Sequence, residues 1–499
     1  MNEREGSKME ALKISKIVEV VGGTLAQGNP EEYITSVSTN SKEMKAKSLF
    51  VPIIGERVDA HNFIAGAMEA GVVATFTSRA MSEIAVVEGK SYILVEDTIA
   101  AMQKLAAYYR SLFAIPVIGV TGSVGKTTTK EMIAAALETK FSVLKTAGNM
   151  NSQVGLPLTI FNIDHSHEIA VIEMGMSEEG ELAKLAAIAR PNIAVVTNIG
   201  VSHIGQLGSK ENIRKEKLNI INENTSVHPG TLYVNGNDQL LHELLPYQSE
   251  LMQPEQAKVF VDLTPKTKEA LLHTKVATYG TEPCAEYYAK NISVNGGNTT
   301  FTLVTSDREE VVELQVLGEH NVMNACVAVA IAKQLGIPEA EAKRGLFTYQ
   351  PIAMRGQIDV VNGITIIDDS YNASPDSMKS GINVLLAMSD VTRRIAVLAD
   401  VLELGEKSRE CHYEVGEYIV KLKLEGTSID ELVVIGKEAK AIAEAVEEAK
   451  VGIRTYQYDS NEEATAYLKA TCKVGDALLV KGSRGMHTDE IVKAMKSME

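Results

Sequence analysis

The stretch VIGVTGSVGKTTTKEM, residues 117–132, constrains the fold of this chain more than any other. It joins a continuous apolar run to a glycine-rich turn, a Lys-Thr pair and a helix-like segment that we expect to end near residue 139. A continuous apolar run is typical of a parallel strand that is covered on both faces. Strand, turn and helix in this order therefore predict an α/β protein built around a parallel sheet.

The turn itself has the features of a phosphate-binding P-loop. Gly122 and Gly125 allow backbone N–H groups to point inward at phosphate oxygens. Lys126 can reach the β- and γ-phosphates, Thr127 can ligate Mg²⁺, and the helix N-terminus adds a positive dipole. The strict G-x-x-x-x-G-K-[ST] pattern is not met, because Val120 stands where its first glycine belongs. A fortuitous glycine-rich turn is the alternative, which the strand and helix in register disfavour.

The rest of the chain alternates short apolar strands with helical stretches, and its 499 residues suggest about three domains. We place these domains at residues 1–113, 114–347 and 348–499. The middle one holds the P-loop and further buried strands at 168–174 and 192–199. The predicted fold class is α/β with three domains, a central P-loop ATPase-type parallel sheet and a C-terminal Rossmann-like domain.

Composition disfavours several classes of function. Acidic residues number 65 against 49 Lys plus Arg, a net charge of −16, whereas nucleic-acid binders carry a basic footprint. The four cysteines form no zinc-ligand spacing, so free thiols in a reducing compartment are expected. No apolar run reaches the ~18 residues of a membrane span, and the first residues lack the apolar core of a signal peptide. We therefore expect a soluble, cytoplasmic protein that binds neither nucleic acid nor membrane.

Two polar residues follow buried strands of the central sheet. Glu173 ends the strand at 168–174, and His203 follows the strand at 192–199. Because the carboxyl ends of parallel strands meet at one edge of a sheet, both side chains should lie beside the phosphate loop. A carboxylate at that place suits Mg²⁺. Taken alone, Glu173 could be a surface residue and His203 a structural or solvated one.

Lys217 lies in a predicted helix at residues 210–222. At 100° per residue it falls within the apolar stripe that runs through Ile213 and Ile220, whereas Arg214 falls outside it. A lysine on the inward face needs either a route for its ammonium to reach water or a chemical purpose. Both interpretations of Lys217 stay open on the pattern alone.

With these residues in place, the chain resembles the Mur ligases of bacterial cell-wall synthesis over nearly its whole length. Ordered blocks carry the similarity, and together they are far more specific than any single motif. The blocks are TGSVGKTTTKEM (121–132), GNMNSQVGLPLT (148–159), IEMGMSEEGEL (172–182), TNIGVSHIGQLGSKENIRKEK (197–217), LGEHNVMNACVAVAIA (317–332), MRGQ (354–357), IIDDSYNASPDSM (366–378), DVLELGEKS (400–408) and VKGSRGM (480–486). The similarity is greatest to the members that add D-alanyl-D-alanine to UDP-MurNAc-tripeptide.

The resemblance implies an ADP-forming ligase of peptidoglycan precursor synthesis that works through an acyl phosphate. It implies a UDP-sugar-binding first domain, a central ATPase domain and a third domain that closes over the site, in a chain that we expect to be a monomer. It also implies ATP, a pair of Mg²⁺ ions and a carbamylated lysine at Lys217. The residues expected to bind ATP are Gly122, Ser123, Gly125, Lys126, Thr127, Thr128, Asn321, Asn324, Arg355 and Asp369. Catalysis is expected from Lys126, Lys217, His203 and Arg355, metal ligation from Thr127, Glu173, His203 and Lys217, and substrate-cleft contacts from the loop with Asn149 and Asn151.

The chain departs from the family pattern at four places. The first-domain motifs Asp-Ser-Arg and Asp-Gly-His are replaced by Asn40-Ser41-Lys42 and by a triplet with Ala60 in its middle. Gln153 stands where Glu is common, and Asp400 follows Ala rather than Gly. The first two changes leave UDP-sugar recognition open. Two alternatives to the main interpretation follow: another amide ligase of the superfamily, similar to folylpolyglutamate synthetase, and a non-catalytic paralogue that binds ATP or a cell-wall precursor.

Overall fold

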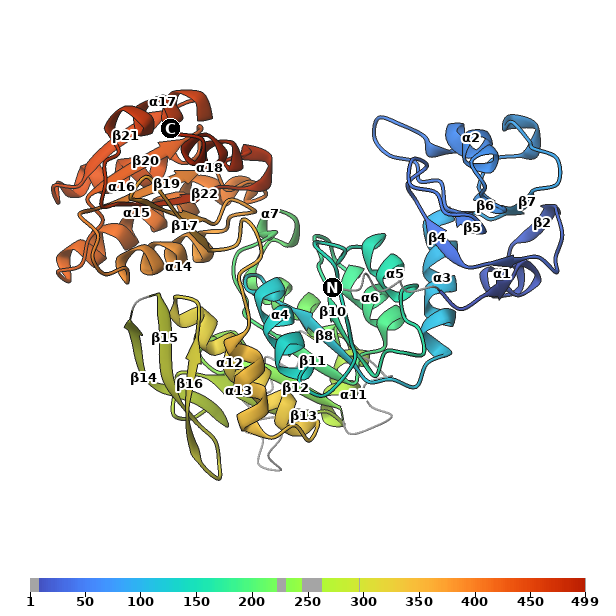
Figure 1. The fold of residues 1–499 in the computed structure, drawn as a ribbon, viewed down its shortest axis with the longest axis horizontal. Coiled ribbons are helices and arrows are strands. Elements are labelled where there is room, and N and C mark those ends of the chain that lie inside the picture. The colour runs from blue at the N-terminus through green and yellow to red at the C-terminus, as the bar shows by residue number, and fades with distance from the viewer. Residues whose placement is uncertain (1–8, 222–229, 245–262, 296, 499) are drawn as a thin grey trace.

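The computed structural model describes residues 9–221, 230–244, 263–295 and 297–498, which form three α/β units, each around its own large sheet (Figure 1). The first unit, blue in Figure 1, has a five-stranded sheet in the order β2-β7-β6-β5-β4. Its elements are β1 (Leu12–Lys13), α1 (Ile14–Val21), β2 (Thr24–Gln27), β3 (Tyr33–Ile34), β4 (Ser36–Ser38), β5 (Ser48–Phe50), α2 (Ile64–Glu69), β6 (Ala74–Thr77), β7 (Ser91–Leu94) and α3 (Thr98–Ser111). Helix α3 joins this unit to the next, because it also packs against α5 (Gly155–Ile160) and α6 (Glu181–Ala189) of the central unit.

The central unit contains a nine-stranded sheet in the order β16-β15-β14-β13-β12-β11-β8-β10-β9. Its strands are β8 (Val117–Thr121), β9 (Val143–Lys145), β10 (Ile169–Glu173), β11 (Ile193–Val196), β12 (Thr231–Asn235), β13 (Lys275–Gly280), β14 (Tyr287–Asn295), β15 (Asn298–Val304) and β16 (Glu309–Leu314). Neighbours from β9 to β14 pair in parallel, and β14, β15 and β16 pair antiparallel. The strand before the P-loop, β8, is buried along its whole length between β10 and β11, as its apolar run predicts.

Helices cover both faces of this sheet. One face packs against α4 (Lys126–Leu137), α12 (Glu319–Gln334) and α13 (Glu339–Phe347), and the other against α5 (Gly155–Ile160), α6 (Glu181–Ala189) and α8 (Lys210–Leu218). The remaining described helices of the unit are α7 (Ile204–Leu207), α9 (Gln239–His242) and α11 (Pro265–Leu272). Apolar side chains of β8 alternate between the two cores, with Val117 on one face and Ile118 on the other. The two-sided cover explains why this strand carries no polar residue before Thr121.

The C-terminal unit, orange to red in Figure 1, has a six-stranded sheet in the order β17-β18-β22-β19-β20-β21. Its strands are β17 (Gln357–Val361), β18 (Ile364–Asp368), β19 (Arg393–Ala399), β20 (Glu431–Ile435), β21 (Arg454–Tyr458) and β22 (Asp476–Lys481). Helices α14 (Pro375–Leu386), α15 (Ser408–Leu424) and α16 (Lys440–Ala449) cover one face, and α17 (Asn461–Thr471) and α18 (Asp489–Lys496) cover the other. The parallel part of this sheet, from β18 to β21, confirms the predicted Rossmann-like domain.

The structure corrects the sequence-based expectations at two places. Helix α8 ends at Leu218 rather than at residue 222, because Asn219 turns the chain and accepts a 2.7 Å hydrogen bond from Thr267 Oγ1; residue 222 itself lies outside the described residues. The two edge strands, β17 and β21, were not predicted, since their exposed outer positions dilute the apolar pattern. Within the described ranges, none of the helices combines the length and the apolar character needed to cross a membrane.

Candidate active site

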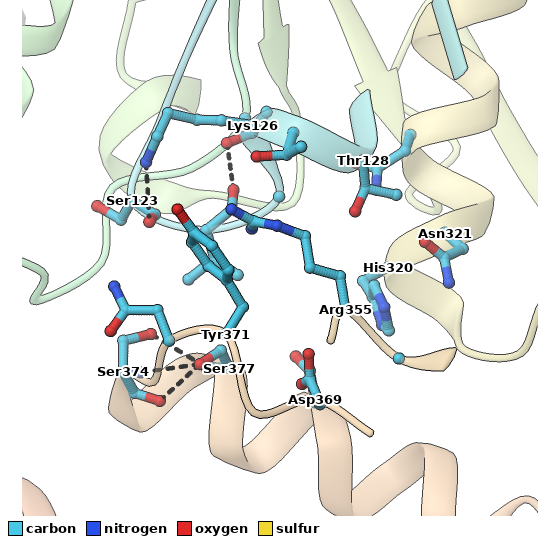
Figure 2. A pocket seen from close by; sticks show the side chains of 18 of the residues that line it. Ser123, Lys126, Thr128, His320, Asn321, Arg355, Asp369, Tyr371, Ser374 and Ser377 are labelled. Carbon is cyan, nitrogen blue, oxygen red and sulfur yellow. Dashed lines mark hydrogen bonds between the residues drawn. The ribbon is translucent and has the colours of Figure 1, made fainter. Parts of the chain in front are cut away.

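A cleft of about 820 Å³ lies between the central and C-terminal units, at the carboxyl ends of β8, β10 and β11. Figure 2 shows P-loop residues on one wall and C-terminal residues on the opposite wall. The predicted residues that line it are Ser123, Gly125, Lys126, Thr127, Thr128, Asn149, Asn151, Glu173, His203, Asn321, Asn324, Arg355 and Asp369. Gly122 and Lys217 do not line the cleft. Residues that lie more than 200 positions apart in the sequence thus meet in one cavity, and its volume is in the range of known ligand-binding sites.

The P-loop needs glycine at two positions. Gly122 has φ +149° and lies so close to Thr197 that a Cβ atom would overlap its hydroxyl oxygen. Gly125 has φ +85° and directly precedes α4, whose first residue is Lys126. Lys126 Nζ donates hydrogen bonds to Gly122 O at 2.8 Å and Ser123 O at 3.4 Å. The loop therefore presents an ammonium group and the N-terminus of a twelve-residue helix to the cleft, which together favour a bound phosphate.

Asn198, which the sequence analysis missed, holds the first half of this loop. Its Oδ1 accepts hydrogen bonds from Ser123 N at 3.0 Å and from Val124 N at 2.9 Å, and its carbonyl accepts a further one from Ser123 N. The prediction that the loop N–H groups point inward is therefore wrong for these two residues. The N–H groups left for phosphate are those at Gly125 and in the first turn of α4.

Charges converge behind the loop. Burial lowers the pKa of Lys126, the nearby Glu173 carboxylate opposes this shift, and Arg355 adds to it. Figure 2 shows Arg355 reaching from the C-terminal side towards Lys126, with its guanidinium stacked 4.0 Å from the ring centre of Tyr371. The stacking holds the arginine in one direction while leaving its N–H donors free of the ring. Two cations from different units therefore face the same region of the cleft.

The donor set at Glu173 fits a hard divalent cation. Glu173 is 1% exposed, its Oε1 accepts a 2.7 Å hydrogen bond from Asn151 Nδ2, and its buried Oε2 has no hydrogen-bond partner. A buried carboxylate oxygen without a partner is costly, and a Mg²⁺ ion would satisfy it. Thr127 and His203 line the same cleft. Among the described residues, no three His, Cys, Asp or Glu side chains cluster as a metal site. A cation beside Glu173 would therefore also need the Thr127 hydroxyl and oxygen atoms of a bound phosphate as ligands.

Lys217 is buried, at 2% exposure, as its place on the apolar stripe predicts. Burial lowers its pKa well below the usual range, and the positive charge of Lys126 lowers it further. The neighbouring Glu216, also missed from sequence, accepts hydrogen bonds from Gly180 N at 3.0 Å and Leu182 N at 2.8 Å. These donors lie at the N-terminus of α6, so Glu216 fixes the rotation of α8 and with it the direction of Lys217.

Arg214 corrects the helix-wheel analysis. It was expected to lie outside the buried face, but it is 2% exposed and donates a 2.7 Å hydrogen bond to Glu243 Oε2. Glu243, the C-cap residue that directly follows α9, belongs to a segment that the wheel did not include. The Glu243 carboxylate thus offsets the desolvation cost of burying Arg214, a second cation on α8.

Two asparagines of α12 face the cleft with unused polar atoms. Asn321 donates to Leu317 O at 2.7 Å and leaves its buried Oδ1 without a partner. Asn324 accepts from Thr129 Oγ1 at 2.9 Å and leaves its buried Nδ2 without one. One free acceptor and one free donor, side by side on a helix, match the edge of a purine base, which offers both kinds of group.

The C-terminal wall carries the remaining predicted residue, Asp369. Its Oδ2 accepts a 2.6 Å hydrogen bond from Lys481 Nζ, and Lys481 is itself 2% exposed. His320 lies close by, and burial lowers its pKa while Asp369 partly opposes that shift. Lys481 was not predicted as a site residue, because nothing in the pattern of β22 separates it from a strand-end lysine.

The altered first-domain motifs lie apart from this cleft. Asp59 Oδ1 accepts hydrogen bonds from His61 N at 2.9 Å and pairs with His61 Nδ1 at 2.7 Å, and its other oxygen accepts from Arg79 Nε at 2.9 Å. Ala60 stands inside this cluster, whereas Asn40 and Lys42 are near the surface. Gln103 of α3 donates to Gln153 Oε1 at 2.9 Å and so links the first unit to the loop with Asn149 and Asn151.

A P-loop at the edge of a parallel sheet, facing a Rossmann-like unit across a cleft with converging cations, defines a three-domain ATP-dependent ligase. Comparison with family models agrees: the Mur ligase middle domain matches residues 120–250 and 250–332, the Mur ligase glutamate ligase domain matches 354–484, and the Mur ligase family catalytic domain matches 33–110. The chain belongs to the Mur ligase family.

Relatives match over almost the entire chain. A UDP-N-acetylmuramoyl-tripeptide–D-alanyl-D-alanine ligase from Bacillus subtilis is 37% identical over 482 residues, covering 96% of this chain and 97% of the relative. The crystal structure of MurF from Acinetobacter baumannii superposes with a TM-score of 0.83 at 26% identity, covering 98% and 100%. MurF from Thermotoga maritima, solved in complex with ADP, superposes with a TM-score of 0.75 at 28% identity, covering 92% and 97%.

Proposed function

We propose that this chain joins D-alanyl-D-alanine to UDP-MurNAc-tripeptide with hydrolysis of ATP to ADP and phosphate. The observation that carries the proposal is the convergence of Lys126, Glu173 and Arg355 on one cleft between two units. The near full-length similarity to D-alanyl-D-alanine ligases supports the choice of substrates. Likeness to folylpolyglutamate synthase, at 15% identity and a TM-score of 0.58, concerns the fold alone.

The chemical difficulty is to bring one anion to another. A carboxylate oxygen of the tripeptide attacks the γ-phosphorus, ADP leaves, and an acyl phosphate forms. Lys126, Arg355 and the N-terminus of α4 would offset the repulsion and stabilise the charge that spreads over the transferred phosphoryl group. The amine of D-alanyl-D-alanine then attacks the acyl carbon, phosphate leaves, and a proton is lost from nitrogen.

Mg²⁺, when bound, would neutralise phosphate charge and align the attacking and leaving oxygens. We propose Glu173, Thr127 and His203 as the residues that hold it. The partnerless Oε2 of Glu173 supports this assignment. Asn151, which donates to the other oxygen of Glu173, would keep the carboxylate turned towards the ion.

We propose that Lys217 acts as a carbamate. Its amine would add to the carbon of CO₂ with loss of a proton, which turns a buried cation into a buried anion. Burial beside Lys126 disfavours the ammonium form and so supports this assignment. The carbamate would balance the charge of Lys126 and add oxygen acceptors on the metal side of the loop.

For the nucleotide, we propose that Asn321 and Asn324 bind the adenine edge through their free acceptor and donor atoms. Asp369, held by Lys481, would lie near the ribose. We further propose domain boundaries at residues 113/114 and 347/348, which fall between the segments matched by the family models. Since the substrates are nucleotide-linked precursors, we propose the cytoplasm as the place of reaction.

Phosphate release tests the function directly. The full chain is incubated with ATP, Mg²⁺, UDP-MurNAc-tripeptide and D-alanyl-D-alanine, and each component is omitted in turn. We expect release only from the complete mixture, with a peptide product larger by one D-alanyl-D-alanine unit. Release that instead requires folate and glutamate would identify the folate ligase alternative. No turnover, together with measurable binding of ATP or precursor, would identify the non-catalytic alternative.

A further inference from the structure

The loop at residues 400–405, which follows β19, brings the C-terminal unit into contact with His203, a residue of the proposed metal site. Glu403 Oε2 lies 2.8 Å from His203 Nδ1, a close polar contact across the two units. The carbonyl of the same Glu403 accepts a hydrogen bond of 3.3 Å from Gly205 N in α7. Leu404, 2% exposed, packs in the same core cluster as Ile204, which is 4% exposed. Side chain, backbone and apolar contacts therefore coincide at this loop.

The backbone at this contact is unusual on both sides. His203 has φ +63° and Glu403 has φ +70°, a left-handed conformation that residues with a Cβ seldom adopt. A Cβ on Gly205 would lie 2.9 Å from Glu403 O, and a Cβ on Gly405 would lie 3.1 Å from Gly205 Cα. Strained residues of this kind persist only where the surrounding structure holds them, and they gather at functional sites.

The contact between Glu403 and His203 adds little stability by itself. The Glu403 side chain is 55% exposed, and pairs that open to water contribute about 0–1 kcal/mol. Its effect on orientation is larger, because the contact occupies one of the two nitrogens of the imidazole. Nδ1 lies 2.8 Å from the carboxylate oxygen but is not aligned for a hydrogen bond with it in this structure. Because the carboxylate occupies the space in front of Nδ1, Nε2 is the nitrogen that His203 can offer to a ligand in the cleft that it lines.

We propose that Glu403 is a positioning residue for His203: the C-terminal unit brings a carboxylate that orients the imidazole towards the divalent cation. This inference rests on the proposed function, which assigns His203 to the metal. Ligating histidines commonly donate their second ring N–H to a carboxylate, which fixes the ring and raises its basicity. Because Glu403 belongs to the C-terminal unit, metal affinity and the docking of that unit become coupled, and each favours the other to the same degree.

Mn²⁺ as a spectroscopic probe tests the inference without turnover. Free Mn²⁺ is measured by electron paramagnetic resonance while it is titrated into the full chain with a non-hydrolysable ATP analogue. We expect Glu403→Ala to weaken Mn²⁺ binding by about 10- to 100-fold, the range for lost outer-shell partners. The matched control is Glu406→Ala, which removes the same charge from an exposed position in the short 3-10 turn that follows this loop and should bind as the parent chain does.

A second readout is the distance between fluorophores on the central and C-terminal units. Mn²⁺ should shorten it in the parent chain and in Glu406→Ala, and should shorten it less in Glu403→Ala. If His203→Ala weakens Mn²⁺ binding but Glu403→Ala binds like Glu406→Ala, the positioning role is wrong while the metal site stands. If His203→Ala also binds Mn²⁺ like the parent chain, the assignment of His203 to the metal is wrong, and the inference falls with it.

Discussion

Asn198→Ala should weaken ATP binding by loosening the phosphate loop that Asn198 holds. The substitution removes the Oδ1 atom that accepts from Ser123 N and Val124 N. Ser123 N keeps a second acceptor, the carbonyl of residue 198, at 3.1 Å, so only the N–H of Val124 loses its partner outright. A donor left without a partner costs about 1–3 kcal/mol. Val124 is only half-buried and water can replace part of the bond, so we expect a cost of about 1–2 kcal/mol for holding the loop in its present conformation. Because the free loop of the variant can relax and ATP binding must then restore that conformation, the ATP dissociation constant should rise by up to about 5- to 30-fold.

Asn192→Ala supplies the matched control. Asn192 Oδ1 accepts a 3.0 Å hydrogen bond from Val117 N, at the opposite end of the same strand β8. Both substitutions thus delete one asparagine amide that holds the backbone of one strand–loop unit, and both should lower stability. Only Asn198→Ala should change ATP affinity, as measured by isothermal titration calorimetry. Equal ATP affinity in the two variants would refute the view that Asn198 shapes the phosphate loop.

Four further outcomes are expected. Lys126→Ala should lower kcat by about 10²-fold or more in a phosphate-release assay, since it removes one preorganised cation from the transition state. Lys217→Ala and Lys217→Arg should both be inactive while ATP still binds, and added formate or acetate should restore part of the activity of Lys217→Ala alone; full activity of Lys217→Arg would exclude the carbamate. Residues from about 350 to 499 should move as a body, so ATP with the UDP-precursor should reduce the radius of gyration in X-ray scattering. Burial opposes ionisation of Asp59, but hydrogen bonds, the largest from His61 N, lower its pKa to about 2. The stabilisation that this ionised carboxylate provides is present above about pH 4 and is lost as the pH falls towards 2. Asp59→Asn should therefore be less stable than the parent chain in urea at about pH 7 and closer to it at about pH 3.

Local pattern was sufficient wherever one element carried the information. The apolar run of β8 predicted a strand covered on both faces, and the glycines of the P-loop predicted a turn that only glycine can make. Period-3.6 spacing correctly predicted that Lys217 is buried. It failed for Arg214 and for the end of α8, because a helix wheel does not include the partners that Glu243 and Thr267 bring from elsewhere.

Sequence by itself determined the fold class, the phosphate loop and the order of the blocks that mark the family, since each of these depends on neighbours along the chain. Only the tertiary structure decided which atoms are satisfied and which are left over. Asn198, Glu216 and Glu403 act on residues of other elements, and no spacing along the chain encodes such a partner. The free oxygen of Glu173 is known only once every donor around it has been placed. The physical reason is that a hydrogen bond or an ion pair is a property of two atoms in space, and a sequence lists residues without their distances.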